Sequence, residues 1–187
     1  ARMFNAATAN AARNGTDVYD EARALCSHFD SASLCLSKGL GAPVGSLVLG
    51  SRDFIRQARR TRKILGGGMR QAGVLAAAGH YALQHHVRRL TEDHARLDRL
   101  AQGLAEANRS HPALQGKITV LPWQTNILFT DLHAEVAPAF TAWLAQHGVR
   151  VTSSLYGGAT RLRWVTHLDV SEAHVTAALE CVARFAG

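Results

Sequence analysis

A strand that ends in a lysine and leads into a run of glycines constrains the fold of this chain more than any other feature. Residues 31–37 are predicted to form a buried strand that ends at Ser37, Lys38 and Gly39, and residues 46–49 are predicted to form a second strand. The loop between the strands holds four residues that break regular structure: Gly39, Gly41, Pro43 and Gly45.

A lysine in this position has two interpretations. Burying an unpaired ammonium is costly, so a lysine at the end of a buried strand often has a covalent role, such as a Schiff base with an aldehyde. The glycines beside Lys38 lack a Cβ and would let a flat ring approach the backbone, and the Ser37 hydroxyl is suited to contact a phosphate group. The alternative is that the Lys38 ammonium extends from the strand end into solvent.

Helical patterns surround this loop. Residues 2–9 are predicted to be a strand end that runs into a loop or helix, and residues 18–28 a short helix. Residues 51–65 have few apolar positions and predict a surface or interface helix. Residues 69–84 are alanine-rich and hydrophobic all round, which predicts a buried helix. Residues 87–108 repeat leucines at helical spacing and predict a long amphipathic helix.

The pattern changes after residues 108–116, where we place a domain boundary. The segments that follow are predicted strands at residues 117–121, 125–130, 149–152 and 161–166, and predicted helices at residues 134–147 and 171–185. We therefore expect residues 109–187 to form a small α+β domain in which helices cover one face of a small sheet.

The formal net charge of +7 argues for an anionic partner of some kind. The basic residues form a run at residues 56–63 and a pair at Arg88 and Arg89. No aromatic side chains interleave with them, although base stacking would require such side chains. The composition thus argues against nucleic acid and favours a small anionic molecule held by a few arginines.

The cysteines and histidines do not predict a disulfide framework or a metal site. Cys26, Cys35 and Cys181 are odd in number and widely spaced, and no Cys-x-x-Cys pair occurs. His85 and His86 have no carboxylate or cysteine at ligand spacing. No apolar run reaches ~18 residues and no signal-peptide pattern is found, so we expect no membrane span and a reducing, cytoplasmic setting.

Three longer motifs resemble segments of the low-specificity L-threonine aldolases. The first is Ser-Leu-Cys-Leu-Ser-Lys-Gly-Leu-Gly-Ala-Pro-Val-Gly-Ser at residues 33–46. The second is Arg-Lys-Ile-Leu-Gly-Gly-Gly-Met-Arg-Gln-Ala-Gly at residues 62–73, and the third is Leu-Arg-Trp-Val-Thr-His-Leu-Asp-Val at residues 162–170. The motifs are long, unusual and in the family's order, so the resemblance covers essentially the whole chain.

The resemblance implies an α/β fold of fold type I, the class of pyridoxal-phosphate enzymes with a large domain, built on a mostly parallel seven-stranded sheet, and a small C-terminal domain. Residues 1–108 would be part of the cofactor-binding large domain and residues 109–187 the small domain. The implied reaction is retro-aldol cleavage of L-threonine, L-allo-threonine or a related β-hydroxy-α-amino acid to glycine and an aldehyde. The implied assembly is a homotetramer, a dimer of dimers with shared active sites.

The resemblance also assigns roles to individual residues. Lys38 matches the lysine that carries pyridoxal 5'-phosphate as a Schiff base. Arg2 matches an arginine near the cofactor and the substrate carboxylate, and Arg163 matches the arginine that binds this carboxylate, for which a planar guanidinium is suited. Arg70, with Lys63 beside it, matches an arginine that reaches the cofactor phosphate of a neighbouring subunit.

Each role has a structural alternative. Arg163 would otherwise be an ordinary arginine on a strand surface, and Arg70 a structural residue of a subunit interface. His167, in the third motif, is expected to be structural rather than catalytic, because an isolated histidine near a strand end is commonly just hydrogen-bonded.

The chain opens with Ala1 and without a helix cap, which suggests a portion of a longer enzyme whose N-terminal segment supplies the rest of the site. The missing parts would include the aspartate that pairs with the pyridinium nitrogen, so the chain alone is expected to be inactive. Two alternatives stay open. One is a non-catalytic assembly subunit in which Lys63, Arg70 and the helix at residues 69–84 form an interface. The other is a different fold type I enzyme, such as an aminotransferase or a cysteine-desulfurase-like lyase.

Overall fold

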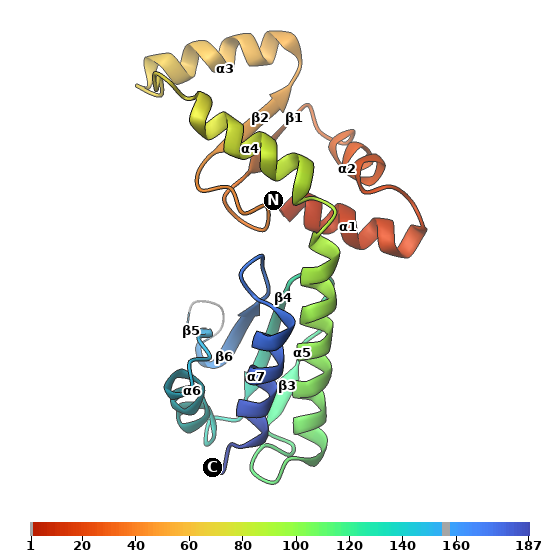
Figure 1. The fold of residues 1–187 in the computed structure, drawn as a ribbon, viewed down its shortest axis with the longest axis vertical. Coiled ribbons are helices and arrows are strands. Elements are labelled where there is room, and N and C mark those ends of the chain that lie inside the picture. Colours follow the sequence, from red (N-terminus) through yellow and green to blue (C-terminus); the bar gives the residue numbers. More distant parts are fainter. Residues whose placement is uncertain (1, 155–157) are drawn as a thin grey trace. The chain divides into compact units, whose positions relative to one another are not determined.

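The chain forms two compact units in a computed structural model that describes residues 2–154 and 158–187. The units comprise Ala1–Thr91 and Glu92–Gly187 (Figure 1). Each unit has its own cluster of buried hydrophobic residues, and no residue belongs to both clusters. The units therefore have separate hydrophobic cores.

Four helices and a two-stranded sheet make up most of the first unit. They are α1 (Arg2–Asn14), α2 (Val18–Cys26), β1 (Ser31–Cys35), β2 (Ser46–Gly50), α3 (Arg52–Ile64) and α4 (Gly73–His85), and α5 (Leu90–Ser110) begins at the end of this unit. The predicted helices and strands between residues 18 and 65 are confirmed.

The prediction of a strand end at residues 2–9 was wrong, because this segment belongs to α1. Phe4 and Ala7 are buried, as are Asn5 and Thr8, so the buried positions recur at the three- and four-residue spacing of one helix face. The segment is also rich in alanine, which favours a helix over a strand. Burial of this face against α2 and β1 is thus what determines the helix.

The two strands of the first unit pair antiparallel, with Ser31 opposite Gly50 and Cys35 opposite Ser46. Every residue of β2 is exposed, although Leu47, Val48 and Leu49 are apolar. A strand that is apolar on both faces is typical of a sheet covered on both sides. All strand pairs among the described residues are antiparallel, so none of the parallel pairs of the implied large sheet lies in this part of the chain.

The helix predicted at residues 69–84 is present as α4, but the prediction that it is buried was wrong for this chain. Gly79 and Ala82 are buried, whereas Val74 and Tyr81 are 70% and 57% exposed. Only one side of the helix packs on the first unit, because a single helix face fits against the loop after β1.

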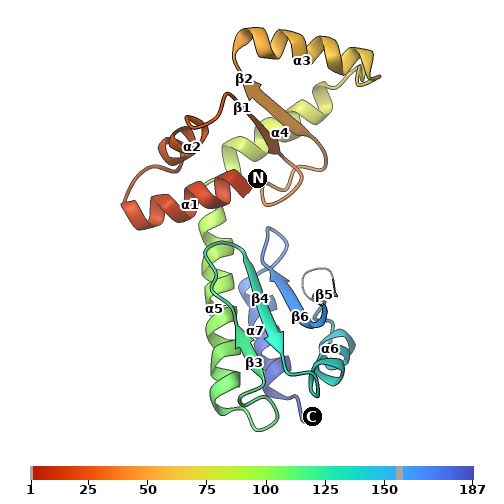
Figure 2. The same cartoon turned by 180° about the vertical axis from the view of Figure 1, so that it is seen from behind.

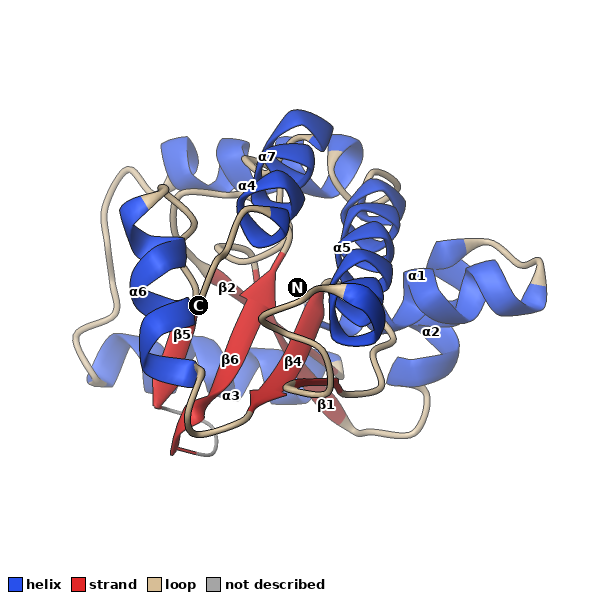
Figure 3. Cartoon of the chain, turned by 90° about the horizontal axis from the view of Figure 1, so that it is seen from below, coloured by secondary structure: helices blue, strands red, loops and turns tan. Residues whose placement is uncertain are grey.

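The second unit is a four-stranded antiparallel sheet of order β3-β4-β6-β5. Its elements are β3 (Ile118–Val120), β4 (Ile127–Leu132), α6 (Ala137–Gln146), β5 (Thr152–Ser154), β6 (Gly158–Val165) and α7 (Glu172–Ala183), together with most of α5. Figure 3 shows α5, α6 and α7 on one face of this sheet, as predicted. Leu104, Phe140 and Leu162 are fully buried between these helices and the strands.

The second unit begins earlier than the predicted boundary near residues 108–116. The compact units divide between Thr91 and Glu92, because the apolar stripe of α5, with Leu97, Leu100 and Leu104, packs into the core of the second unit. The sequence of a long amphipathic helix reveals the spacing of its apolar residues, but it does not reveal which hydrophobic core those residues join.

Candidate active site

Lys38 lies in a tight turn between β1 and β2. The Gly41 amide donates to the Lys38 carbonyl at 2.8 Å, and Gly41 has a φ of 68°, a left-handed conformation that glycine adopts readily. The Leu36 amide donates to the Gly45 carbonyl at 2.9 Å, and the Ala42 amide donates to the Leu36 carbonyl at 3.1 Å. These hydrogen bonds close residues 36–45 into a compact loop.

The Lys38 side chain is exposed, so the premise that it ends a buried strand was wrong for this chain. β1 ends at Cys35, and the turn directs Ser37 and Lys38 outward while Leu36 and Leu40 are buried. An exposed primary amine beside an exposed hydroxyl can react with a carbonyl compound without first being uncovered. The turn therefore leaves the Lys38 side chain exposed to solvent instead of burying it.

Close contacts hold this turn on several sides. A Cβ on Gly39 would lie 3.0 Å from the Asn5 Nδ2 of α1 and 3.3 Å from the Leu90 Cδ2 of α5, so no larger residue fits without movement. A Cβ on the buried Gly79 of α4 would lie 2.8 Å from the Leu36 Cδ1. Figure 2 shows the start of α1 beside the loop that follows β1. The turn is thus fixed by packing that involves three helices.

Arg2 is exposed at the beginning of α1. It precedes Asn5 by three residues, which places both on one face of the helix. Because Asn5 contacts Gly39 of the turn, Arg2 extends from the end of α1 that adjoins Lys38. The structure thus brings these two predicted site residues to the same part of the first unit.

Lys63 and Arg70 belong to the glycine segment between α3 and α4. The Gly67 amide donates to the Arg62 carbonyl at 2.8 Å, and a Cβ on Gly68 would lie 2.9 Å from the Lys63 Nζ. The Lys63 ammonium therefore lies directly over the backbone of Gly68. The N-cap residue of α4, Ala72, makes no side-chain capping hydrogen bond, so no capping side chain occupies the first backbone amides of this helix.

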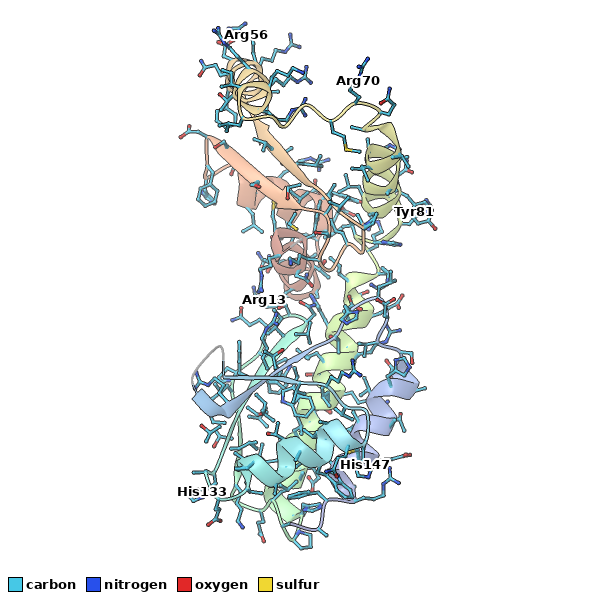
Figure 4. The ribbon with its side chains drawn as sticks, turned by 90° about the vertical axis from the view of Figure 1, so that its left-hand side faces the viewer. Arg13, Arg56, Arg70, Tyr81, His133 and His147 are labelled. Atoms are coloured by element: carbon cyan, nitrogen blue, oxygen red, sulfur yellow. The ribbon has the colours of Figure 1, made fainter. Side chains whose placement is uncertain are left out.

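The structure separates this segment from Lys38 within one chain. Arg70 precedes the first residue of α4, whereas the carbonyl of Leu40, in the Lys38 turn, is bound at the other end of α4 by His86. Thirteen helical residues span about 20 Å. Figure 4 shows Arg70 beyond the start of the helix that carries Tyr81. Lys63 and Arg70 therefore lie apart from the Lys38 turn of the same chain.

Arg163 lies on the open face of the second unit's sheet. Leu162 and Trp164 are buried on the helical side, so Arg163, which alternates with them along β6, faces the other way and is half-buried. Its cross-strand partners are Phe129 of β4 and Thr152 of β5. Arg163 therefore has a neighbouring strand on each side.

A second arginine on the same face is tied to a carboxylate. The Arg161 Nε and Nη2 each donate to Asp131 at 2.6 Å, the two-pronged geometry in which arginine binds carboxylates best. The hydrogen bond from Arg161 holds the pKa of Asp131 below its usual value. The pair also shows that this face accommodates an arginine–carboxylate contact.

Family membership follows from the sequence of the first two-thirds of the chain. The beta-eliminating lyase family matches residues 1–127. The chain belongs to this family.

The curated relatives of this chain confirm the resemblance to low-specificity L-threonine aldolases. The enzyme of that name from Escherichia coli O157:H7 is 43% identical over 171 residues, which are 91% of this chain and 45% of the relative. Low-specificity L-threonine aldolase 1 from Arabidopsis thaliana is 37% identical over 185 residues, which are 97% of this chain and 47% of the relative. The chain therefore spans about half the length of the curated relatives it matches.

Solved structures confirm that the chain has the α/β fold of type I pyridoxal-phosphate enzymes. The aromatic amino acid beta-eliminating lyase/threonine aldolase structure from Exiguobacterium superposes with a TM-score of 0.69 at 16% identity, covering 98% of this chain and 50% of the other. Alanine–glyoxylate aminotransferase from Nostoc gives a TM-score of 0.59 at 13% identity, covering 83% and 47%. These likenesses establish the fold and leave the reaction open.

The lysines of the chain differ in how well their surroundings fit a cofactor that carries an aldehyde. The sequence has three lysines, Lys38, Lys63 and Lys117. The Lys117 Nζ lies 3.1 Å from a Glu135 carboxylate oxygen, and the Lys63 Nζ lies over Gly68. Lys38 is the lysine that combines an exposed amine, a neighbouring hydroxyl and a fixed turn. This donor set fits a cofactor that carries an aldehyde and a phosphate.

Sequence reasoning missed the contacts that orient the third motif. The buried Thr166 donates from Oγ1 to the Asp93 carbonyl at 2.6 Å, and the Asn126 Nδ2 donates to the Thr166 carbonyl at 2.7 Å. The His167 Nδ1 accepts a 3.3 Å hydrogen bond from the Asp169 amide, which agrees with the structural role predicted for His167. The partners of Thr166 lie 73 and 40 residues away in sequence, so no local pattern indicates them.

Within residues 2–154 and 158–187, no group of three or more His, Cys, Asp or Glu side chains is arranged to hold a metal ion. The helices of this described part include none that is long and apolar enough to cross a membrane. Among these described residues, Cys26, Cys35 and Cys181 form no disulfide.

Proposed function

We propose that this lyase acts as a pyridoxal-phosphate-dependent aldolase, which cleaves L-threonine, L-allo-threonine and related β-hydroxy-α-amino acids to glycine and an aldehyde. The observation that carries the proposal is the exposed Lys38 amine on a turn fixed by α1, α4 and α5. The names of the relatives, low-specificity L-threonine aldolases, support the same reaction and substrate class.

When bound, pyridoxal 5'-phosphate supplies an aldehyde that condenses with amines and a ring that draws electrons from the amino acid Cα. Lys38 supplies the amine that holds the cofactor. The Ser37 hydroxyl, beside it on the turn, is suited to donate a hydrogen bond to the phosphate. Arg2, which starts from the end of α1 that adjoins the turn, is suited to bind anionic groups of cofactor and substrate.

Arg163 is proposed to grip the substrate carboxylate with two parallel hydrogen bonds. Its place between Phe129 and Thr152 limits the directions that the side chain can take, which suits it to orient a small amino acid. Cleavage of the Cα–Cβ bond requires a base for the β-hydroxyl proton, and we assign that role to no residue of this chain.

We further propose a cytoplasmic homo-oligomer, a dimer of dimers, in which Lys63 and Arg70 bind the cofactor phosphate of a neighbouring copy. The distance between the two ends of α4 supports this assignment, because the glycine segment is remote from Lys38 of its own chain. Since the relatives are about twice as long, we expect residues outside these 187 to supply the remaining cofactor contacts.

Product analysis tests the proposed reaction against the alternatives. We expect the whole protein, including the residues outside these 187, to release glycine and acetaldehyde in equal amounts when it is incubated with pyridoxal 5'-phosphate and L-threonine. Transfer of the amino group to an added keto acid, without glycine release, would instead identify an aminotransferase. If the whole protein catalyses neither reaction, the result would favour the alternative that this chain belongs to a non-catalytic assembly subunit.

Replacing Arg163 by alanine is expected to raise the KM for L-threonine by about 10- to 100-fold, since a hydrogen bond to a charged group contributes about 1.5–3 kcal/mol. This KM would be measured from the steady-state kinetics of glycine release. Arg161→Ala is the matched control: it lies on the same face but is bound to Asp131, so its KM should change less than about threefold. An unchanged KM in Arg163→Ala would remove Arg163 from the site.

A further inference from the structure

A histidine at the end of α4 holds the turn that carries Lys38. The His86 Nδ1 lies 2.6 Å from the Leu40 carbonyl oxygen. A carbonyl oxygen can only accept a hydrogen bond, so Nδ1 carries the proton and donates it. The two residues are 46 positions apart in sequence, so the hydrogen bond is a tertiary contact rather than part of a local turn.

This contact satisfies a carbonyl that water cannot reach. Leu40 is fully buried, and a buried carbonyl needs a hydrogen-bond partner within the protein. The backbone hydrogen bonds of the loop use the carbonyls of Leu36, Lys38 and Gly45, and the side chain of His86 serves the carbonyl of Leu40.

The position of Leu40 explains why this contact matters for Lys38. Lys38 and Leu40 belong to the turn that the hydrogen bond from the Gly41 amide to the Lys38 carbonyl closes. Rotation of the Leu40 peptide would therefore move the backbone from which the lysine side chain extends. Packing at Gly39 holds one part of the turn, and His86 holds the next peptide along.

We propose that His86 is a positioning residue for Lys38, whose donated hydrogen bond fixes the turn so that the lysine amine meets the cofactor aldehyde in a productive orientation. The inference rests on the proposed function, because it takes Lys38 as the lysine that reacts. In this role, His86 donates a hydrogen bond to the Leu40 carbonyl and does not need to contact the cofactor.

Two substitutions separate the hydrogen bond from the bulk of the ring. His86→Asn keeps a donor nitrogen attached to Cγ, the position that Nδ1 occupies in histidine, whereas His86→Leu fills space without a donor. His85→Leu is the matched control, because His85 is the neighbouring exposed histidine, which stacks on Tyr81 with ring centres 4.3 Å apart.

The measurement is the rate at which pyridoxal 5'-phosphate is trapped on Lys38. Condensation of Nζ with the aldehyde forms an imine and releases water, and borohydride then supplies the hydride that reduces the imine to a stable secondary amine. Peptide mass spectrometry quantifies the adduct on each of the three lysines, and Lys117, whose ammonium is bound to Glu135, serves as the internal reference. Hydrogen exchange at the Gly41 and Ala42 amides reports whether the turn itself has loosened.

We expect His86→Leu to slow trapping on Lys38 by about tenfold relative to Lys117, since small displacements of a reacting group are costly. It should also speed exchange at Gly41 and Ala42. His86→Asn should restore both, and His85→Leu should change neither. Unchanged trapping on Lys38 in His86→Leu would overturn the positioning role and leave the proposed function intact. No trapping on Lys38 in the unsubstituted protein would overturn the proposed function and, with it, this inference.

Discussion

Replacing Lys38 by alanine is expected to lower amino-acid cleavage by about 10³-fold or more and to remove the yellow colour of the lysine–cofactor imine. The alanine side chain has no amine that can condense with an aldehyde, so the cofactor loses its covalent attachment. Lys38 is also the lysine of this chain that is exposed on a fixed turn beside a hydroxyl group. No other lysine is expected to replace it.

Absorbance spectra and glycine release would be measured on Lys38→Ala and Lys38→Arg. The arginine variant keeps the positive charge but provides no amine that forms an imine, so both variants should be colourless and inactive. Lys117→Ala is the control, because its ammonium is bound to Glu135, and its colour and activity should remain. Cleavage that persists in Lys38→Ala would rule out the proposed role of this lysine.

Local sequence patterns were sufficient to locate the predicted site residues but not their surroundings. The motif at residues 33–46 indicated Lys38 as the Schiff-base lysine, but its position after a strand left open whether the side chain is buried or exposed. The direction of a side chain after a strand depends on where the turn begins. The hydrogen bond from His86 was missed because its acceptor, the Leu40 carbonyl, lies 46 residues away.

The burial of α4 shows a second limit. The sequence of α4 is apolar on all sides and therefore predicted a buried helix. The helix is present, but whether its faces are buried depends on which other parts of the protein pack against them. Most of the large exposed apolar side chains in the described residues lie between Phe29 and Tyr81, in the first unit. Leu168 is the exposed apolar side chain of this kind in the described part of the second unit. The sequence of one chain cannot say which neighbouring polypeptide covers such a surface.

Most elements of the second unit were predicted, because its strands alternate and its helices are amphipathic, but the strand predicted at residues 149–152 lies at Thr152–Ser154. β4 buries Leu128, Thr130 and Leu132 and turns Ile127, Phe129 and Asp131 to the open face. That alternation sets which face of β6 carries Arg163. Hydrophobic residues that recur every two positions in strands and every 3.6 positions in helices are sufficient to predict such a domain. The strand register that pairs Arg161 with Asp131 cannot be read from these periodicities and is seen only in the folded sheet.

Replacing Phe140 by alanine is expected to destabilise the second unit by about 3–5 kcal/mol, a large share of the ~5–15 kcal/mol that stabilises a typical domain. Phe140 is fully buried between α6 and the sheet, and its ring meets Phe185 edge-on at a centre distance of 5.2 Å. Removal of the ring leaves a cavity and loses this contact. The lost stability should therefore exceed that of any exposed phenylalanine.

Phe129→Ala is the matched control, because Phe129 lies on the open face of the same sheet and is only half-buried. Denaturant unfolding would measure both variants, and hydrogen exchange would locate the change. In Phe140→Ala the amides of β4 and β6 should exchange faster, whereas those of residues 36–45 should not, because the buried side chains near Lys38 belong to a separate cluster. Equal losses of stability in the two variants would contradict a core confined to the helical side of the sheet. Faster exchange at residues 36–45 would contradict the independence of the two cores, and Arg163 would then depend on the same folding event as Lys38.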